Sequence, residues 1–258
     1  MKIAYCVCFF FEERRFNRVS GIYYDQYYFL EKHLQFVKKR PKKINTVYFV
    51  INKSESTDVE KIIDIVNSYN INKQITVMFR ENIDFSYGAW NDIIKKDLIA
   101  GGHDYYFLIE DDYIPKSTNF IDAFLDRMKE NIAYVAVRTT PPTYADIQNL
   151  TQRIGLSIDL APKIHASISN GLLNGAAAKH ILKNKDNIFL LYGSTSYEMA
   201  ETNQLMFLET FTTEGYAITD ISDQYSAIFN HNLGNLEQMG EGDDIIIPIR
   251  GDLNDITF

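Results

Sequence analysis

The stretch Tyr105-Tyr106-Phe107-Leu108-Ile109-Glu110-Asp111-Asp112 decides the fold. Its five large apolar residues show no polar alternation, which is typical of a strand covered on both faces in a mostly parallel sheet. Functional groups in such sheets lie at the carboxyl ends of the strands. The stretch therefore predicts an α/β fold with a candidate site at the three acids, ahead of Pro115.

Three adjacent carboxylates repel one another, and burial adds a desolvation cost. They stay ionised only beside a cation or an array of hydrogen-bond donors. Hard oxygen ligands of this kind favour Mg²⁺ or Mn²⁺ that carries the phosphates of a substrate. The alternative is an acidic surface turn, and the triplet alone does not separate the two interpretations.

Composition bounds the class of protein. The chain has 258 residues, 46% of them hydrophobic, which is enough for one substantial core. A net charge of -8 argues against a nucleic-acid partner, because such binding rests on clustered Lys and Arg. Cys6 and Cys8 would point to the same side of a strand, so we expect reduced core cysteines.

The longest apolar run is too short for a membrane span. Residues 3–11 fall well below the roughly 20 residues that cross a bilayer, and no small-residue cleavage site follows them. We therefore expect a soluble, cytoplasmic protein without a transmembrane segment.

Hydrophobic periodicity predicts alternating strands and helices. In the first half, strands are expected at 2–10, 46–51, 74–79 and 105–109, with helices at 23–39, 54–69 and 88–100. In the second half, strands are expected at 132–137, 164–169 and 216–221, with helices at 119–129, 174–182 and 194–214. Residues 138–163 are either a binding loop or contain an unrecognised helix.

Two further motifs accompany the acids. The segment from Arg80 to Trp90 includes Asn82, Ser86 and Gly88-Ala89, and it follows a strand and opens a helix. Ser86 suits a helix N-cap, and the amide end of a helix favours a phosphate. The segment 169–177 is rich in Asn, Gly and Ala. Taken singly, each also fits an ordinary turn with a core residue.

Together and in this order, the three motifs resemble the GT-A glycosyltransferases, in particular the inverting family 2 that uses nucleotide-diphospho-sugars. The resemblance covers roughly residues 1 to 225. It implies a Rossmann-like, mostly parallel sheet flanked by helices. It also implies one catalytic domain at 1–228, with a nucleotide-binding half at 1–115 and an acceptor-binding half at 116–228. The tail at 229–258 is then either mobile or ordered only by a ligand.

The resemblance assigns roles to the triplet. The first acid of the family motif usually contacts the ribose, and the last binds a divalent metal that bridges the two phosphates. We therefore expect Glu110 at the substrate, Asp112 at Mn²⁺ or Mg²⁺, and Asp111 in support. His231 in the tail is a further candidate metal ligand, against the ordinary alternative of an exposed loop histidine.

The second motif is similar to the family pattern Asn-x-Gly-x-Asp-x-Gly-Ala-Trp. This chain has Asp84 where Gly is usual and Ser86 where Asp is usual. Arg80, Asn82 and Ser86 are expected on the donor side. In the third motif, Asn170 and Gly171 are expected beneath the donor sugar, where small residues leave room.

In this fold the nucleobase lies over the ends of the first two strands. Phe9 and Arg15 lie near the end of the first strand, and Asn52 follows the second. An amide both donates and accepts, so Asn52 suits the imide edge of uracil and favours a UDP-sugar donor. Core packing is the alternative for Phe9.

An inverting transfer needs a general base, usually a carboxylate. Relatives place an acidic pair about twelve residues before the Gly-Tyr that matches residues 215–216, but this chain has Asn203-Gln204 there. The nearest acids are Glu201 and Glu198. Glu198 follows Thr195 at the spacing of a capping box, so Glu201 is the better candidate.

Three other readings stay open. One is a retaining glycosyltransferase of the same fold. Another is a sugar-phosphate nucleotidyltransferase, although those enzymes begin with a glycine-rich loop and residues 12–20 contain no glycine. The third is a non-catalytic carbohydrate- or nucleotide-binding module. In the favoured reading the acceptor is a glycan or glycoconjugate.

Overall fold

The computed structural model describes residues 1–11, 14–16, 23–25, 27–39, 41, 43–71, 75–115, 118–222 and 246–248. For 14–16, 23–25, 167–168 and 246–248 it describes the backbone alone. The statements below refer to these residues.

A seven-stranded sheet with the order β10-β8-β9-β6-β1-β4-β5 forms the centre of the molecule. Its strands are β1 (Ile3–Phe10), β4 (Ile44–Lys53), β5 (Ile75–Glu81), β6 (Tyr105–Glu110), β8 (Ile132–Thr140), β9 (His165–Asn174) and β10 (Ala217–Asp220). Strands β5, β4, β1 and β6 run parallel, as do β8 and β10. Strand β9 is antiparallel to β6 and β8. The sheet confirms the predicted mostly parallel α/β class.

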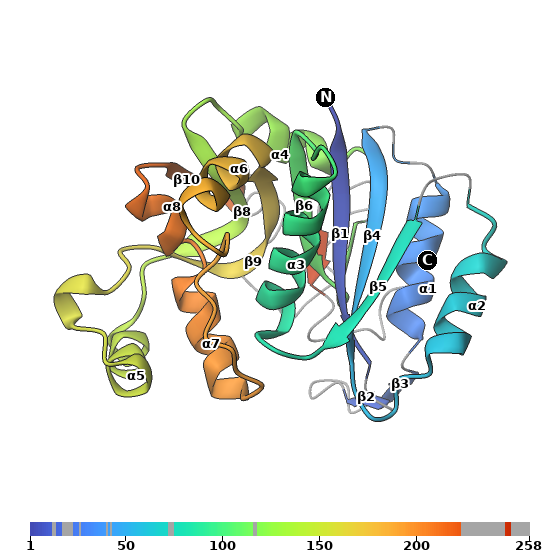
Figure 1. Ribbon diagram of the computed structural model, residues 1–258, viewed down its shortest axis with the longest axis horizontal. Coiled ribbons are helices and arrows are strands. Elements are labelled where there is room, and N and C mark those ends of the chain that lie inside the picture. The colour runs from blue at the N-terminus through green and yellow to red at the C-terminus, as the bar shows by residue number, and fades with distance from the viewer. Residues whose placement is uncertain are drawn as a thin grey trace.

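Helices cover both faces of the sheet (Figure 1). They are α1 (Tyr28–Lys38), α2 (Val59–Ser68), α3 (Phe85–Ile99), α4 (Ile121–Arg127), α5 (Tyr144–Ile154), α6 (Gly175–Asn184), α7 (Tyr197–Met206) and α8 (Glu209–Thr213), with a 3-10 turn at Ile158–Leu160. Helices α1, α2 and α4 contribute to one core cluster. Helices α3, α6 and α8 contribute to the other.

Strand β1 shows why a large core lies on each face of the sheet. Tyr5, Val7 and Phe9 pack into the core under α1, whereas Cys6 and Cys8 pack into the core under α3. Side chains alternate between the two faces of a strand, so a strand buried on both sides reads as a continuous apolar run. Both cysteines are free and buried, as expected.

Several element boundaries differ from the sequence prediction. The helix expected from residue 23 begins at Tyr28, because Tyr23–Asp25 forms β3 and pairs with β2 (Arg14–Phe16). The helix expected at 194–214 is divided into α7 and α8. The segment 138–163 contains α5, which starts with a capping box between Thr143 and Asp146.

A short strand, β7 (Tyr113–Pro115), directly follows the acids and pairs with β11 (Ile246–Pro248). Otherwise the tail expected at 229–258 lies outside the described residues. Among the described helices, none has the length and apolar character that a bilayer crossing requires.

Candidate functional site

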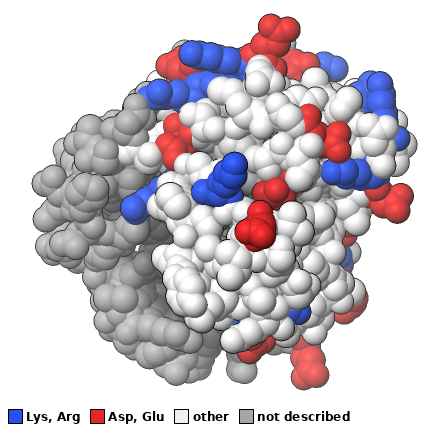
Figure 2. All heavy atoms as spheres, turned by 90° about the vertical axis from the view of Figure 1, so that its left-hand side faces the viewer, with Lys and Arg blue, Asp and Glu red and all other residues white. Residues whose placement is uncertain are grey.

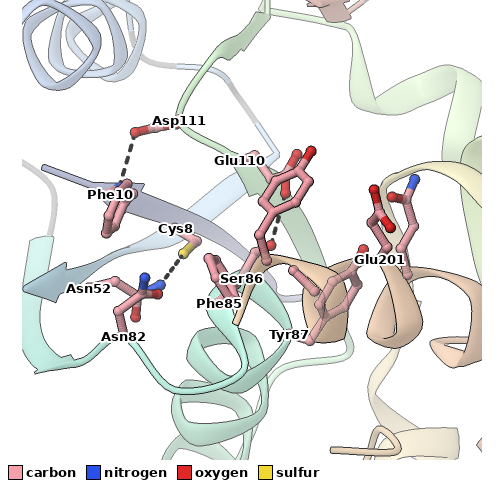
Figure 3. Close-up of a pocket in the computed structure, with 13 residues that line it drawn as sticks. Cys8, Phe10, Asn52, Asn82, Phe85, Ser86, Tyr87, Glu110, Asp111 and Glu201 are labelled. Atoms are coloured by element: carbon pink, nitrogen blue, oxygen red, sulfur yellow. Dashed lines mark hydrogen bonds between the residues drawn. The ribbon is translucent and has the colours of Figure 1, made fainter. Parts of the chain in front are cut away.

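A pocket of about 270 Å³ opens at the carboxyl ends of β1, β4 and β6, where α3 begins. Helix α7 forms its other side (Figure 3). The pocket is lined by Cys8, Phe10, Asn52, Asn82, Phe85, Ser86, Tyr87, Glu110, Asp111, Tyr197, Ala200, Glu201 and Gln204. The sheet thus brings together residues from both halves of the chain, as expected for a site at the strand ends.

Two asparagines form one end of the pocket. Asn52, only 1% exposed, donates through Nδ2 to Cys8 Sγ at 3.3 Å, and its Oδ1 accepts from Arg80 Nη1 at 2.7 Å. Asn82 lies beside Asn52 in Figure 3. Its Oδ1 is buried without a hydrogen-bond partner among the described residues. This end of the pocket therefore presents amide groups whose hydrogen-bonding capacity is not fully used.

Arg80 supports this end from outside. Its Nε contacts Asp92 Oδ2 at 2.9 Å as an ion pair, and its Nη2 donates to the Ile83 carbonyl at 2.9 Å. Arg80 is not among the pocket-lining residues. The predicted contact of Arg80 with substrate stays a prediction; in the structure its guanidinium is engaged within the protein and fixes the orientation of the Asn52 amide.

The first strand supplies Phe10, not Phe9, to the pocket. Phe9 points to the opposite face, where its ring packs edge-on against Phe49 and His33. The structure thus places Phe9, predicted as a substrate contact, in the α1 core and outside the pocket lining, because side chains alternate along β1. The side chain of Arg15 lies outside the described residues.

Glu110 and Asp111 both line the pocket and are held in different ways. Glu110 Oε1 accepts from Ser86 Oγ at 2.8 Å, and its backbone N–H donates to Asn170 Oδ1 at 2.8 Å. Asp111 Oδ2 accepts from the Phe10 N–H at 3.1 Å. Both hydrogen-bonded carboxylates appear in Figure 3. The first two acids of the triplet are therefore part of a pocket wall, and the triplet is not an exposed acidic turn.

Asp112 is placed differently from its two neighbours. It is 3% exposed and is absent from the pocket lining. Burial lowers the pKa of the nearby His33 imidazole, and the charge of Asp112 opposes that shift only in part. The chain has already turned from β6 into β7 at this point, so Asp111, rather than Asp112, accompanies Glu110 in the pocket.

Sequence reasoning missed the role of His33, which is buried on the apolar face of α1. Its Nε2 lies 2.9 Å from the Asp111 carbonyl oxygen, and its Nδ1 lies 2.8 Å from Tyr5 Oη. A carbonyl only accepts, so Nε2 carries the proton and Nδ1 accepts from the tyrosine. Burial lowers the pKa of His33 to about 4, so the ring is neutral near pH 7. A neutral imidazole thus fixes the backbone of the acidic turn.

A divalent ion at the acids would need several oxygen ligands. The described residues contain no group of three or more His, Cys, Asp or Glu side chains that could hold a metal. Two acids, Glu110 and Asp111, line the pocket. One or two carboxylates suffice for Mg²⁺ or Mn²⁺ only when substrate phosphates complete the coordination. An ion at these two acids would therefore need the oxygens of a bound diphosphate to complete its coordination. His231 lies outside the described residues.

Asn170 and Gly171 lie within β9 and do not line the pocket. Asn170 supports Glu110 from behind. A Cβ on Gly171 would overlap the Val135 carbonyl oxygen and approach the Tyr134 ring to 2.8 Å. The substrate contact of these two residues stays a prediction, and the close approach of β8 and β9 by itself requires glycine at position 171.

The two candidate bases on α7 differ in their position relative to the pocket. Glu201 lines the pocket, is 46% exposed and pairs with Arg153 of α5, with 2.9 Å between Oε2 and Nη1. Glu198 is exposed and does not line the pocket. The helix cap is Ser196, which accepts from the Met199 N–H, so the predicted capping box from Thr195 to Glu198 does not form.

The chain was compared with known proteins at the level of family, sequence and structure, and only solved structures match. No protein-family model and no curated protein matches the chain. Among solved structures, 4-diphosphocytidyl-2C-methyl-D-erythritol synthase from Anaerococcus prevotii DSM 20548 is similar over 84% of this chain and 85% of that one. The identity is 13% and the TM-score 0.45, so this likeness is too distant to carry an argument about function.

Proposed function

We propose that the protein is a glycosyltransferase that moves a sugar from a nucleotide-diphospho-sugar to a hydroxyl of a glycan or glycoconjugate. One observation carries the proposal: a single pocket is lined by the Asn52 amide and the Asp111 carboxylate toward one end, the Glu110 carboxylate between, and the Glu201 carboxylate on the α7 side (Figure 3). This order suits a nucleobase, a diphosphate and an acceptor hydroxyl. The motifs that resemble family 2 glycosyltransferases point to the same reaction class.

The amide end would bind the nucleobase. Asn52 Nδ2 has a second hydrogen to donate, and Asn82 has an amide oxygen to accept. Uracil presents an N–H between two carbonyl groups. A carbonyl oxygen of the base could accept from Asn52, and the N–H could donate to Asn82. Phe10 and Phe85 add aromatic surface to the lining, on which a base can stack. A UDP-sugar is therefore the favoured donor.

The middle of the pocket would bind the diphosphate. A diphosphate beside Glu110 and Asp111 is repelled unless a cation lies between them. These two residues would hold Mn²⁺ or Mg²⁺ jointly with the phosphate oxygens. When bound, the ion offsets the charge that develops on the departing nucleotide. The start of α3, at Phe85, adds amide groups that favour a phosphate.

The α7 side would bind the acceptor. Glu201 is a carboxylate at the pocket, and Arg153 fixes its orientation. In an inverting transfer it would accept the proton of the acceptor hydroxyl as that oxygen attacks the anomeric carbon. Tyr197, 69% exposed on the same helix face, gives the acceptor an aromatic surface.

The proposal is tested by screening nucleotide-sugars for Mn²⁺-dependent nucleotide release, with and without glycan acceptors. We expect release with a UDP-sugar, and loss of that release in Glu110→Gln, which keeps the size and the Ser86 hydrogen bond. Glu201→Gln should lower kcat by about 10²- to 10⁴-fold, the usual contribution of a general base. Glu198→Gln, on the same helix but outside the pocket, is the matched control.

Product stereochemistry by NMR distinguishes inversion from retention. An active enzyme whose Glu201→Gln variant matches the wild type would place the base elsewhere. If no nucleotide-sugar is turned over and no nucleoside diphosphate binds, the proposal fails.

A further inference from the structure

Asp84 is a buried carboxylate that the proposed reaction does not use. It is 4% exposed and stands at the N-cap position of α3, yet its side chain makes no hydrogen bond that caps α3. Its φ is 55° and that of Phe85 is 50°, so two consecutive non-glycine residues adopt left-handed backbone. Such strained backbone persists only where the surrounding structure enforces it.

The carboxylate is directed at the segment that leads into α7. Its two oxygens accept from three successive backbone N–H groups, Tyr192 at 3.0 Å, Gly193 at 3.0 Å and Ser194 at 3.4 Å. The Asp84 N–H in turn donates to the Ser194 carbonyl at 2.7 Å. A fourth donor is Asn203 Nδ2 of α7, at 3.2 Å from Oδ1. Several donors of this kind are what a buried charge requires.

These contacts determine where α7 lies. The hydrogen bonds from the backbone N–H groups of residues 192–194 hold the chain just before α7. The hydrogen bond from Asn203 holds α7 itself, on its buried side. The opposite face carries the pocket-lining residues Tyr197, Ala200, Glu201 and Gln204, at the spacing of a single helical stripe. The same strained turn also brings Phe85 into the pocket lining. One carboxylate thus ties the start of α3 to the helix across the pocket.

We propose that Asp84 is a positioning residue, which sets α7 and its stripe of side chains at working distance from the nucleotide side of the pocket. The charge is essential to this role, because an amide in its place turns an N–H₂ group toward donors that need an acceptor. The spacing of the two pocket walls therefore depends on Asp84, whereas Asn52, Glu110 and Asp111 are held by other contacts.

The first test does not depend on the reaction and uses hydrogen exchange of the full chain. Asp84→Asn should raise amide exchange at 192–206 at least tenfold and leave α2 and β4 at the wild-type rate. Asp64→Asn, an exposed acid of α2, is the matched control and should change nothing. Unchanged exchange at 192–206, or equal acceleration throughout the chain, would overturn the positioning role.

A second test rests on the proposed function. In Asp84→Asn the Kd for UDP with Mn²⁺ should stay within twofold of wild type, while the ratio of sugar transfer to donor hydrolysis falls at least tenfold. Equal losses of nucleotide binding and transfer would show a purely structural role. If the wild type transfers no sugar, the proposed function fails and the exchange measurement still decides on Asp84.

A pair of variants tests the contact with α7 directly. Asn203→Asp places a second buried carboxylate against that of Asp84. It should accelerate hydrogen exchange at 192–206 more than Asp84→Asn does. The double variant Asp84→Asn with Asn203→Asp restores one donor and one acceptor, so its exchange should slow toward that of Asp84→Asn. A double variant that exchanges as fast as Asn203→Asp alone would refute the coupling.

Discussion

At the scale of single residues, the acidic turn depends on a histidine that must stay neutral. His33 is fully buried, and its pKa of about 4 lies below the usual 6.5. The unfolded chain therefore binds a proton at a higher pH than the folded chain does. The stabilising effect of neutral His33 is complete above pH 6.5 and is lost as the pH falls toward 4. Between pH 7 and 5 the loss is about 2 kcal/mol.

We therefore expect His33→Gln to be less stable than wild type at pH 7, because the Tyr5 and Asp111 contacts change. Its stability should also fall less between pH 7 and pH 5. Urea unfolding of both proteins at the two pH values measures this difference. Equal losses in the two proteins would show that His33 does not titrate in this range.

Gly171 was predicted from the sequence as a substrate contact, and the structure gives it a packing role. Gly171→Ala should cost about 1 to 3 kcal/mol of stability, the usual range for overpacking a core. Gly155→Ala is the control, since an added Cβ there meets no atom within 4 Å and the cost is limited to its left-handed backbone. Thermal unfolding compares them, and a larger loss in Gly155→Ala would contradict this explanation.

At the scale of elements, the side of the pocket formed by α7 is fixed from two directions. Asp84 fixes α7 from the sheet side, and Arg153 of α5 donates to the Glu198 carbonyl at 2.6 Å and pairs with Glu201. Arg153→Met keeps much of the side-chain volume but removes both contacts. We expect it to lower sugar transfer about tenfold or more while UDP affinity is retained. Parallel losses in both measurements would argue against a specific role at Glu201.

The sequence was sufficient for elements whose pattern is local. The apolar run from Tyr105 to Ile109 placed the central strand and its acids, and Gly101-Gly102, both with positive φ, ended α3 as expected. The sequence was not sufficient to show toward which face of the sheet each side chain points. Period-two alternation shows that Phe9 and Phe10 face opposite sides, but only the assembled sheet shows which face opens into the pocket.

Contacts between distant segments explain the remaining differences. Asp84 stands where the family pattern has Gly, but the sequence does not show its hydrogen-bond partners, which lie more than 100 residues later in the chain. The choice between Asp111 and Asp112 depends on the turn from β6 to β7, which no periodic pattern encodes. A sequence pattern therefore locates the site more readily than it assigns each side chain within it.

At the scale of the whole molecule, one sheet joins the two predicted halves, because β6 pairs with β1 on one edge and β9 on the other. We therefore expect a single cooperative unfolding transition by calorimetry. Two resolved transitions would contradict this view.

The face shown in Figure 2 carries Lys and Arg interspersed with Asp and Glu and no gathering of basic residues in its described part. This distribution agrees with the net charge of -8.

The central claim is that the pocket binds a nucleoside diphosphate between the Asn52 end and the two acids. Calorimetric titration of the full chain with UDP, with and without Mn²⁺, tests it most directly. The claim predicts saturable one-to-one binding that needs Mn²⁺ and is lost in Glu110→Gln and Asp111→Asn, two variants that keep size and hydrogen-bonding oxygens. No binding heat with any nucleoside diphosphate, or equal affinity in both variants, would contradict it.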